Sequence, residues 1–183
     1  MSFDNSLIQK WHEKAKNQDD FFTKYVFEYL SFIAYVKTHS GLDKPNDRNC
    51  IQELKRNAII RQRYIKLIDE DIDLKEDWIK IKAEFDRTRL GNASNNLNNV
   101  EECKWWNCHQ MNLDQSTEEE KIEIKGVINS LDNWSNMIEF WYIIRNNLFH
   151  GAKSPENKCD LFVMEYGYKT LSKFLDMMLE DVE

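Results

Sequence analysis

Glycine and proline are scarce in this chain, which contains only five glycines and two prolines in 183 residues. This scarcity favours long helices over a β architecture, whose turns use both residues often. Most of them also separate segments with helical spacing of apolar side chains: Gly41 and Pro45, Gly91, and Gly151 with Pro155. With 42% hydrophobic residues, the chain has enough apolar side chains for one core. The sequence therefore predicts a single all-α domain over residues 1–183, an antiparallel helical bundle with long first and last helices.

Apolar periodicity sets the bounds of the expected helices. They cover residues 4–16 and 19–39, either separate or continuous, and residues 47–69, 72–89, 118–132, 134–150 and 157–181. Asn133 is a favoured N-cap residue for the helix that follows it. Residues 91–117, rich in asparagine, form one long irregular segment. Gly126 and Gly167 lie inside expected helices, where a glycine permits close packing of a neighbouring helix.

One segment, Arg145-Asn146-Asn147-Leu148-Phe149-His150-Gly151, joins two side chains with complementary chemistry. The spacing places Arg145 inside a helix and His150 at its last residue, about 7.5 Å further along the axis. A guanidinium stays charged at every relevant pH and offers a fixed fork of donors to phosphate oxygens. An imidazole titrates near neutrality and suits proton transfer. Such a pair can span a nucleotide phosphate and the neighbouring ribose hydroxyl.

A purely structural interpretation of this segment is also open. His150 can satisfy the last carbonyls of the helix and interact with its negative end, and Arg145 can be a buried ion-pair partner. Asn146 and Asn147 weigh against this, because two poor helix formers inside a helix cost stability without an evident return in packing. The sequence therefore favours a functional site.

The motif of Arg145, a polar residue and His150 before Gly151 resembles the R-x4-6-H signature of the HEPN family of all-helical domains. Asp20 to Gly41 resembles the long aromatic first helix of one branch, and Asp160 to Leu179 its closing helix. Many HEPN proteins are metal-independent endoribonucleases that act as homodimers with a composite active site. Many belong to toxin–antitoxin or phage-defence systems, controlled by an antitoxin or another regulatory partner. Other members only bind nucleotides, RNA or proteins.

The resemblance implies roles for individual residues. His150 would be the general acid or base, Arg145 would neutralise the scissile phosphate, and Asn146 would help to position it. RNA cleavage would give a 2′,3′-cyclic phosphate. Asn147 and Lys153 would add contacts to the substrate, although a lysine after a helix is ordinarily solvated. One branch carries a modified tyrosine two residues after the histidine; here Ala152 stands there, which puts that mode of control in doubt.

Charge is distributed unevenly along the chain. The net charge of −7 argues against broad nucleic-acid binding, which depends on many basic residues. The segment from Lys55 to Lys66 nevertheless carries five basic residues and no acid, with Tyr64 among them. Arg61 and Arg63 in this segment are candidates for guiding RNA to the site. A solvated helix face paired with the acids of residues 69–77 explains the segment equally well.

Two helices are expected to supply core or interface. The aromatic helix over 19–39 has apolar residues on more than one face, so we expect it to be covered on several sides. The last helix carries a stripe near heptad spacing, which suits either the core or a dimer seam. Its members are Leu161, Met164, Tyr168, Leu171, Leu175 and Met178.

Cys103, Cys108 and His109, with Cys159 as a fourth, form a candidate zinc set, but adjacent ligands and the missing second C-x-x-C pair favour reduced, structural cysteines. No glycine-rich phosphate loop, nucleophile elbow or H-E-x-x-H motif occurs, so we expect neither metal nor cofactor. The polar start of the chain and the lack of an apolar run of membrane-spanning length predict a cytoplasmic protein without a membrane partner.

Overall fold

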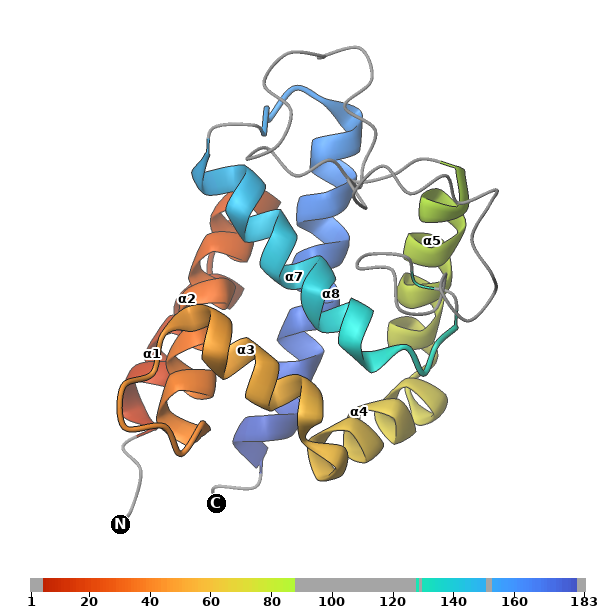
Figure 1. Ribbon diagram of the computed structural model, residues 1–183. Helices are drawn as coiled ribbons and strands as arrows, with labels where there is room; N and C mark the ends of the chain where they lie inside the picture. The colour runs from red at the N-terminus through yellow and green to blue at the C-terminus, as the bar shows by residue number, and fades with distance from the viewer. Residues whose placement is uncertain (1–4, 88–127, 129, 151–152, 181–183) are drawn as a thin grey trace.

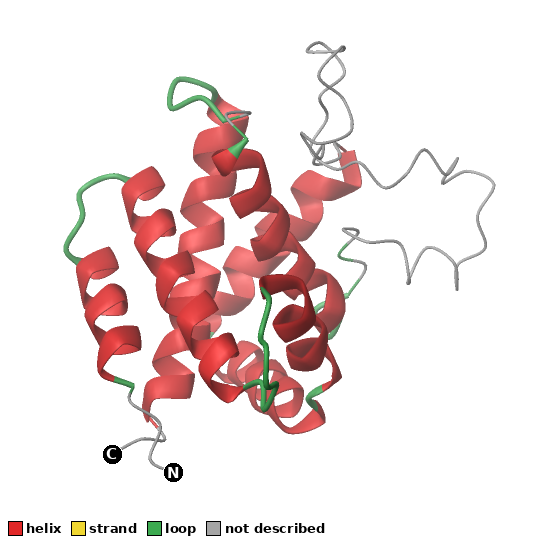
Figure 2. Cartoon of the chain, turned by 60° about the vertical axis from the view of Figure 1, so that its left-hand side comes forward, coloured by secondary structure: helices red, strands yellow, loops and turns green. Residues whose placement is uncertain are grey.

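The computed structural model describes residues 5–87, 128, 130–150 and 153–180. These residues form seven helices and no strand, which confirms the all-α expectation (Figures 1 and 2). The helices are α1 (Ser6–Lys16), α2 (Phe21–His39), α3 (Asp47–Arg56), α4 (Ala58–Glu70), α5 (Ile72–Arg87), α7 (Trp134–Phe149) and α8 (Lys158–Leu179).

The first two helices are separate and pack against each other as a hairpin. α1 ends at Lys16, and α2 begins after Asp20, whose extended backbone departs from the helix. The Asp20 carboxylate accepts a hydrogen bond from the backbone N–H of Thr23 at 2.9 Å, as an N-cap residue does. A capping aspartate thus decides between the separate and the continuous helix.

The expectation of one helix over 47–69 was wrong. Asn57 adopts an extended conformation and ends α3, and its side chain accepts a hydrogen bond from the N–H of Ile60 at 3.0 Å. One asparagine therefore serves as the C-cap of α3 and the N-cap of α4. Most of the expected helix 118–132 lies outside the described residues, and residues 130–132 are not helical.

Helix α8 is the centre of the bundle, with α1, α2, α5 and α7 packed around it (Figure 1). Gly167 lies at the place where α8 meets α2 and α7. A Cβ atom there would lie 2.8 Å from Ile144 Cδ1 and 3.0 Å from Tyr25 Cε2. The glycine thus permits the close packing that the sequence suggested; Gly126 lies outside the described residues.

Large aromatic side chains fill the core, including Tyr25, Phe32, Tyr64, Trp78, Trp141 and Phe174. The polar atoms of Tyr64, Trp78 and Trp141 form hydrogen bonds inside the protein, as is usual for buried tyrosine and tryptophan. Trp78 Nε1 donates to the Tyr64 hydroxyl at 3.0 Å, which itself donates to the carbonyl of Thr170 at 2.9 Å. Trp141 Nε1 donates to Thr170 Oγ1 at 2.9 Å.

The apolar stripe of α8 belongs to this core. Met164, Leu171, Leu175 and Met178 are buried, whereas Tyr168 is partly buried and Leu161 is 41% exposed. The stripe is therefore not available as a dimer seam. The expectation for α2 is confirmed, because Tyr25, Tyr29, Phe32, Tyr35 and Val36 are all buried in it.

Candidate functional site

Helix α7 is buried in its first part and becomes partly exposed towards its C-terminal end. It begins after Asn133, whose side chain accepts a hydrogen bond from the N–H of Asn136, and ends at His150, whose N–H donates to the carbonyl of Asn146 at 3.0 Å. Residues 136–141 are all buried. The solvent-accessible positions after them are Tyr142, Arg145, Asn146, Leu148, Phe149 and His150. The C-terminal end of α7 therefore presents the predicted motif at the surface.

The Arg145 guanidinium is held by rings and an amide more than by a carboxylate. Its Nη1 donates to Asn146 Oδ1 at 3.0 Å. The guanidinium carbon Cζ lies 5.0 Å from the ring centre of Phe149 and 5.9 Å from that of Tyr29. The nearest carboxylate in an ion pair, Asp47, is 3.8 Å from Nη2. Since the side chain is 32% exposed, much of its positive charge remains available to an anion.

His150 is exposed, and no hydrogen bond or ion pair joins its ring to the described part of the chain. It does not lie directly beside Arg145. Residues five apart on an α-helix differ by about 140° around its axis. The two side chains thus share one end of α7 but leave it in different directions.

Two residues that were predicted to contact the substrate, Asn147 and Lys153, make contacts within the protein instead. Asn147 is only 2% exposed, so its amide lies inside the protein. Lys153 Nζ lies 2.5 Å from Asp160 Oδ1, and the second oxygen of that carboxylate accepts from the N–H of Ser154 at 2.9 Å. With a side chain only 9% exposed, Lys153 joins the loop after α7 to α8 and does not extend into solvent.

The basic segment around α4 is not brought to the motif. Figure 1 shows α4 at the bottom of the molecule and the C-terminal end of α7 near the top. Arg61 is exposed there, while Arg63 Nη2 donates to the carbonyl of Met177 at 3.1 Å. Tyr64 is a core residue and not a surface ring.

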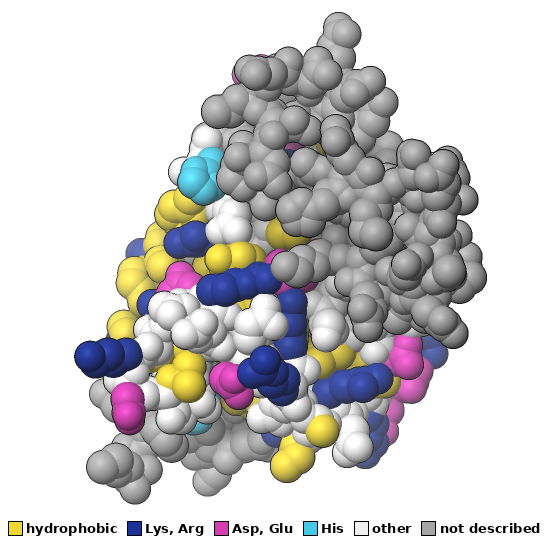
Figure 3. Space-filling view, viewed as in Figure 1, with side chains coloured by type: hydrophobic (Ala, Val, Ile, Leu, Met, Phe, Trp, Pro, Cys, Tyr) yellow, Lys and Arg dark blue, Asp and Glu magenta, His cyan; other side chains and the backbone are white. Residues whose placement is uncertain are grey.

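The structure places charges from α3 beside α7, including Lys55 from the start of the predicted basic segment. Arg48 Nη1 lies 2.9 Å and 3.1 Å from the two carboxylate oxygens of Glu139, and Lys55 Nζ binds the same group. Burial opposes the charge of Glu139, but Lys55 and Arg48 outweigh it and lower its pKa. Arg48 also lies over the Tyr142 ring, 5.3 Å from its centre. Figure 3 shows Lys and Arg side chains gathered on this face, with hydrophobic side chains among them.

Sequence reasoning missed Asp47, Arg48, Tyr142 and Phe149 as members of this surface. For Phe149 a signal exists, because the helix spacing puts it four residues after Arg145, on the same side. For the α3 residues none exists, because only the tertiary contact between α3 and α7 brings them to the motif.

A second histidine is surrounded quite differently. His12 Nδ1 lies 2.7 Å from Glu28 Oε1, and His12 Nε2 lies 2.9 Å from Asp176 Oδ1, which also binds Lys16 at 2.6 Å. Burial disfavours the charged imidazole, but the hydrogen bonds to Asp176 and Glu28 outweigh it and raise the pKa of His12 to about 9. This cluster joins α1, α2 and α8.

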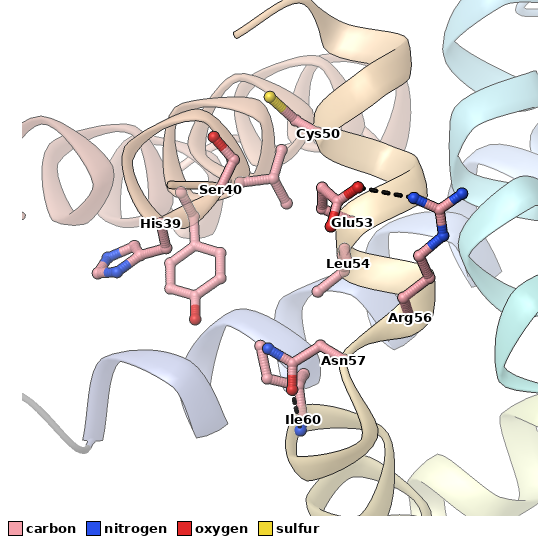
Figure 4. A pocket seen from close by; sticks show the side chains of 10 residues that line it. His39, Ser40, Cys50, Glu53, Leu54, Arg56, Asn57 and Ile60 are labelled. Carbon is pink, nitrogen blue, oxygen red and sulfur yellow. Dashed lines mark hydrogen bonds and ion pairs between the residues drawn. The ribbon is translucent and has the colours of Figure 1, made fainter. Parts of the chain in front are cut away.

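A cavity of about 230 Å³ lies between the end of α2, α3 and the start of α4 (Figure 4). Tyr35, Val36, Cys50 and Leu54 form its apolar wall, and Glu53 at its edge is paired with Arg56 at 2.8 Å. A second hollow of about 410 Å³ lies between α5 and α8. Neither of these two hollows contains a residue of the predicted motif.

Within the described ranges, no group of three or more histidine, cysteine, aspartate or glutamate side chains is placed to hold a metal ion. Cys103, Cys108 and His109 lie outside these ranges, Cys50 is buried, and Cys159 is exposed. None of the helices in the part of the chain that the structure describes is long and apolar enough to cross a membrane.

Comparisons with protein-family models, with curated proteins and with solved structures find no match to this chain. The expectation of a HEPN-like domain therefore depends on the motif from Arg145 to His150 and on the resemblance of its flanking helices.

Proposed function

We propose that the protein is a metal-independent endoribonuclease whose site is the C-terminal end of α7. The observation that carries the proposal is the state of the two motif side chains. Arg145 is partly exposed with its nearest ion-pair carboxylate 3.8 Å away, and the exposed imidazole ring of His150 has no hydrogen bond to a described residue. A charged group and a proton-transfer group therefore reach the surface at the same end of α7, where a substrate could contact both.

The chemistry requires no metal. His150 would take the proton of a ribose 2′-hydroxyl, the 2′-oxygen would attack the adjacent phosphorus, and the bond to the 5′-oxygen would break. Arg145 would stabilise the negative charge that develops on the phosphate oxygens. Asn146, which already orients the guanidinium, would act as a positioning residue. The products would be a 2′,3′-cyclic phosphate and a free 5′-hydroxyl, whose proton a protonated histidine supplies.

The angle between the two side chains favours a composite site in a homodimer. Because Arg145 and His150 of one helix diverge by about 140°, they do not converge on one phosphate from the same side. Two copies related by a two-fold axis, with their α7 ends facing each other, would place the histidine of one copy opposite the arginine of the other. A cytoplasmic setting in a toxin–antitoxin or phage-defence system, with a protein partner that restrains the nuclease, fits such an enzyme.

The same divergence favours a second function if the protein acts as a monomer. In that case Arg145 would bind a phosphate of RNA or of a nucleotide without cleaving it, and the protein would be a non-catalytic binding module. The two functions differ in one property, since only the first depends on His150 for a change in the RNA.

The test is incubation of purified protein with total RNA and with defined oligonucleotides in EDTA. We expect cleavage with 2′,3′-cyclic phosphate ends, and its loss in the Arg145→Ala and the His150→Ala variants. Lys10→Ala is the control, because it removes an exposed basic side chain from α1. Cleavage at the wild-type rate by both motif variants would overturn the proposal. RNA binding without cleavage would favour the binding module.

A further inference from the structure

Two aromatic rings, each paired with a guanidinium, occupy one side of α7. Arg48 lies 5.3 Å from the ring centre of Tyr142, and Arg145 lies 5.0 Å from that of Phe149. Seven residues separate the rings, so they lie on nearly the same side of the helix and about 10 Å apart along its axis. Arg145 lies between them in sequence. We call these four residues the α7 stripe.

The rings of the α7 stripe are accessible. Phe149 is 59% exposed, and Tyr142 is partly exposed. Phe149 contributes little to the core in this position, whereas an exposed ring beside a cation is a surface on which a nucleic-acid base can stack. A ring that gains little from burial but is held beside an arginine indicates binding rather than folding.

The charge of this face indicates an anionic partner. Among the described residues, Lys37, Arg48, Lys55 and Arg145 are paired on this face with the carboxylates of Asp47 and Glu139. In these ion pairs the basic side chains outnumber the carboxylates, on a chain whose net charge is −7. An acidic partner is attracted to this face and repelled by the remainder of the surface.

We infer that the α7 stripe binds single-stranded RNA, with one base stacked on Phe149, a second on Tyr142, and a backbone phosphate at Arg145. Alternating rings and cations are the arrangement with which proteins bind single strands, since every base has a face that stacks. Paired bases are already stacked inside their helix and do not offer this face. The inference rests on the proposed function for the identity of the ligand, and it names the substrate class as unpaired RNA.

The experiment measures binding separately from cleavage. The probe is a fluorescent 2′-O-methyl RNA of twelve nucleotides without self-complementarity, whose blocked 2′-oxygens prevent cleavage by 2′-oxygen attack. Fluorescence anisotropy gives its affinity for the wild-type protein as a single strand and in a duplex with its complement. We expect the single strand to bind more tightly than the duplex.

Two variants of Phe149 isolate the ring. Phe149→Leu keeps an apolar side chain but removes the aromatic face, and it should weaken single-strand binding about five-fold or more. Phe149→Trp should restore it. Ile72→Ala, which alters an isoleucine that is 73% exposed at the start of α5, should leave the affinity unchanged. A melting curve checks that each variant is folded.

The outcomes separate the inference from the proposed function. If the Leu variant and the wild type bind the single strand equally, or if the duplex binds as tightly as the single strand, the inference is overturned, even if the enzyme cleaves RNA. A stripe that docks a protein instead would give the same result. If binding depends on the ring but no RNA is ever cleaved, the inference stands and the nuclease proposal fails.

Discussion

Two histidines of this protein, His12 and His150, lie in opposite surroundings. His12 is 5% exposed and has a carboxylate on each ring nitrogen, Glu28 on one side and Asp176 on the other. His150 is exposed at the end of α7. In the first case the hydrogen-bonding capacity of the imidazole is used by the fold, and in the second no side chain of the described residues uses it.

The difference teaches that a histidine's role depends on partners that are distant in sequence. The partners of His12 lie 16 and 164 residues away, on α2 and α8. The residues next to His12 in the sequence do not predict these partners, whereas the neighbours of His150 within α7 form a recognisable motif. The comparison predicts that changes at the two positions affect different properties, stability at His12 and activity at His150.

The largest effect on stability is expected from His12→Ala. This change leaves the Glu28 carboxylate, which is fully buried, without its charged partner. Removing one member of a buried ion pair costs on the order of 3–5 kcal/mol of the free energy of unfolding. Urea unfolding followed by circular dichroism measures it. The same experiment on His150→Ala should change the free energy by less than about 0.5 kcal/mol, as expected for an exposed position. Equal losses of unfolding free energy in the two variants would contradict the contrast between His12 and His150.

The pH dependence of stability should report the same cluster. The pKa of His12 is raised from 6.5 to about 9. The charged imidazole therefore contributes fully to the free energy of unfolding below pH 6.5, and this contribution is lost as the pH rises through 9. Burial disfavours the charged carboxylate of Asp176, but the hydrogen bonds from His12 and Lys16 outweigh it and lower its pKa to about 2. The contribution of Asp176 to the free energy of unfolding is therefore lost as the pH falls from 3.8 towards 2. We expect the free energy of unfolding to fall between pH 7 and 9 in the wild type. The fall should be absent in His12→Ala, and its persistence there would assign it to another group.

A smaller loss is expected from Glu139→Gln, in the buried part of α7. The glutamine keeps the size of the side chain but removes the charge that binds Arg48 and Lys55. Hydrogen bonds to charged groups contribute about 1.5–3 kcal/mol each, and the amide retains part of them, so we expect a loss of about 1–3 kcal/mol. Thermal unfolding measures this change. Stability equal to that of the wild type would mean that the charge of Glu139 adds nothing to the contact between α3 and α7.

The smallest effect is expected from Asp47→Asn. Asp47 lies 3.8 Å from Arg145 and 2.6 Å from Lys37, in pairs that are partly exposed and therefore weak. Removing its charge frees Arg145 for a phosphate, and single-stranded RNA should bind up to about five-fold more tightly. The anisotropy assay measures this gain. Weaker binding would show that Asp47 supports the site instead of competing with the ligand.

Much of the fold was accessible from the sequence because helix signals are local. Apolar spacing and the scarcity of glycine and proline predicted the bounds of α2, α7 and α8 to within two residues. The break at Asn57 was missed because apolar and basic residues continue across it without glycine or proline. Asn57 is itself a good N-cap residue, so a capping rule applied at every asparagine would have suggested it.

The candidate site was less predictable, because its members come from different helices. The sequence placed Arg145 and His150 at the end of α7 correctly, since helix spacing decides that. It did not foresee that Asn147 is buried or that Lys153 is bound by Asp160, because both depend on how α7 packs against α8. Nor did the sequence predict that Arg48 lies over the Tyr142 ring, because that depends on the contact between α3 and α7.

The measurement that tests the account most directly is the RNA cleavage rate of His150→Ala in EDTA, at a temperature where circular dichroism shows it to be as folded as the wild type. The account predicts that the variant keeps the wild-type free energy of unfolding and loses cleavage by at least about 100-fold, the contribution of a general acid or base. A variant that cleaves RNA at the wild-type rate would contradict the assignment of His150. Loss of folding in this variant would contradict the contrast with His12.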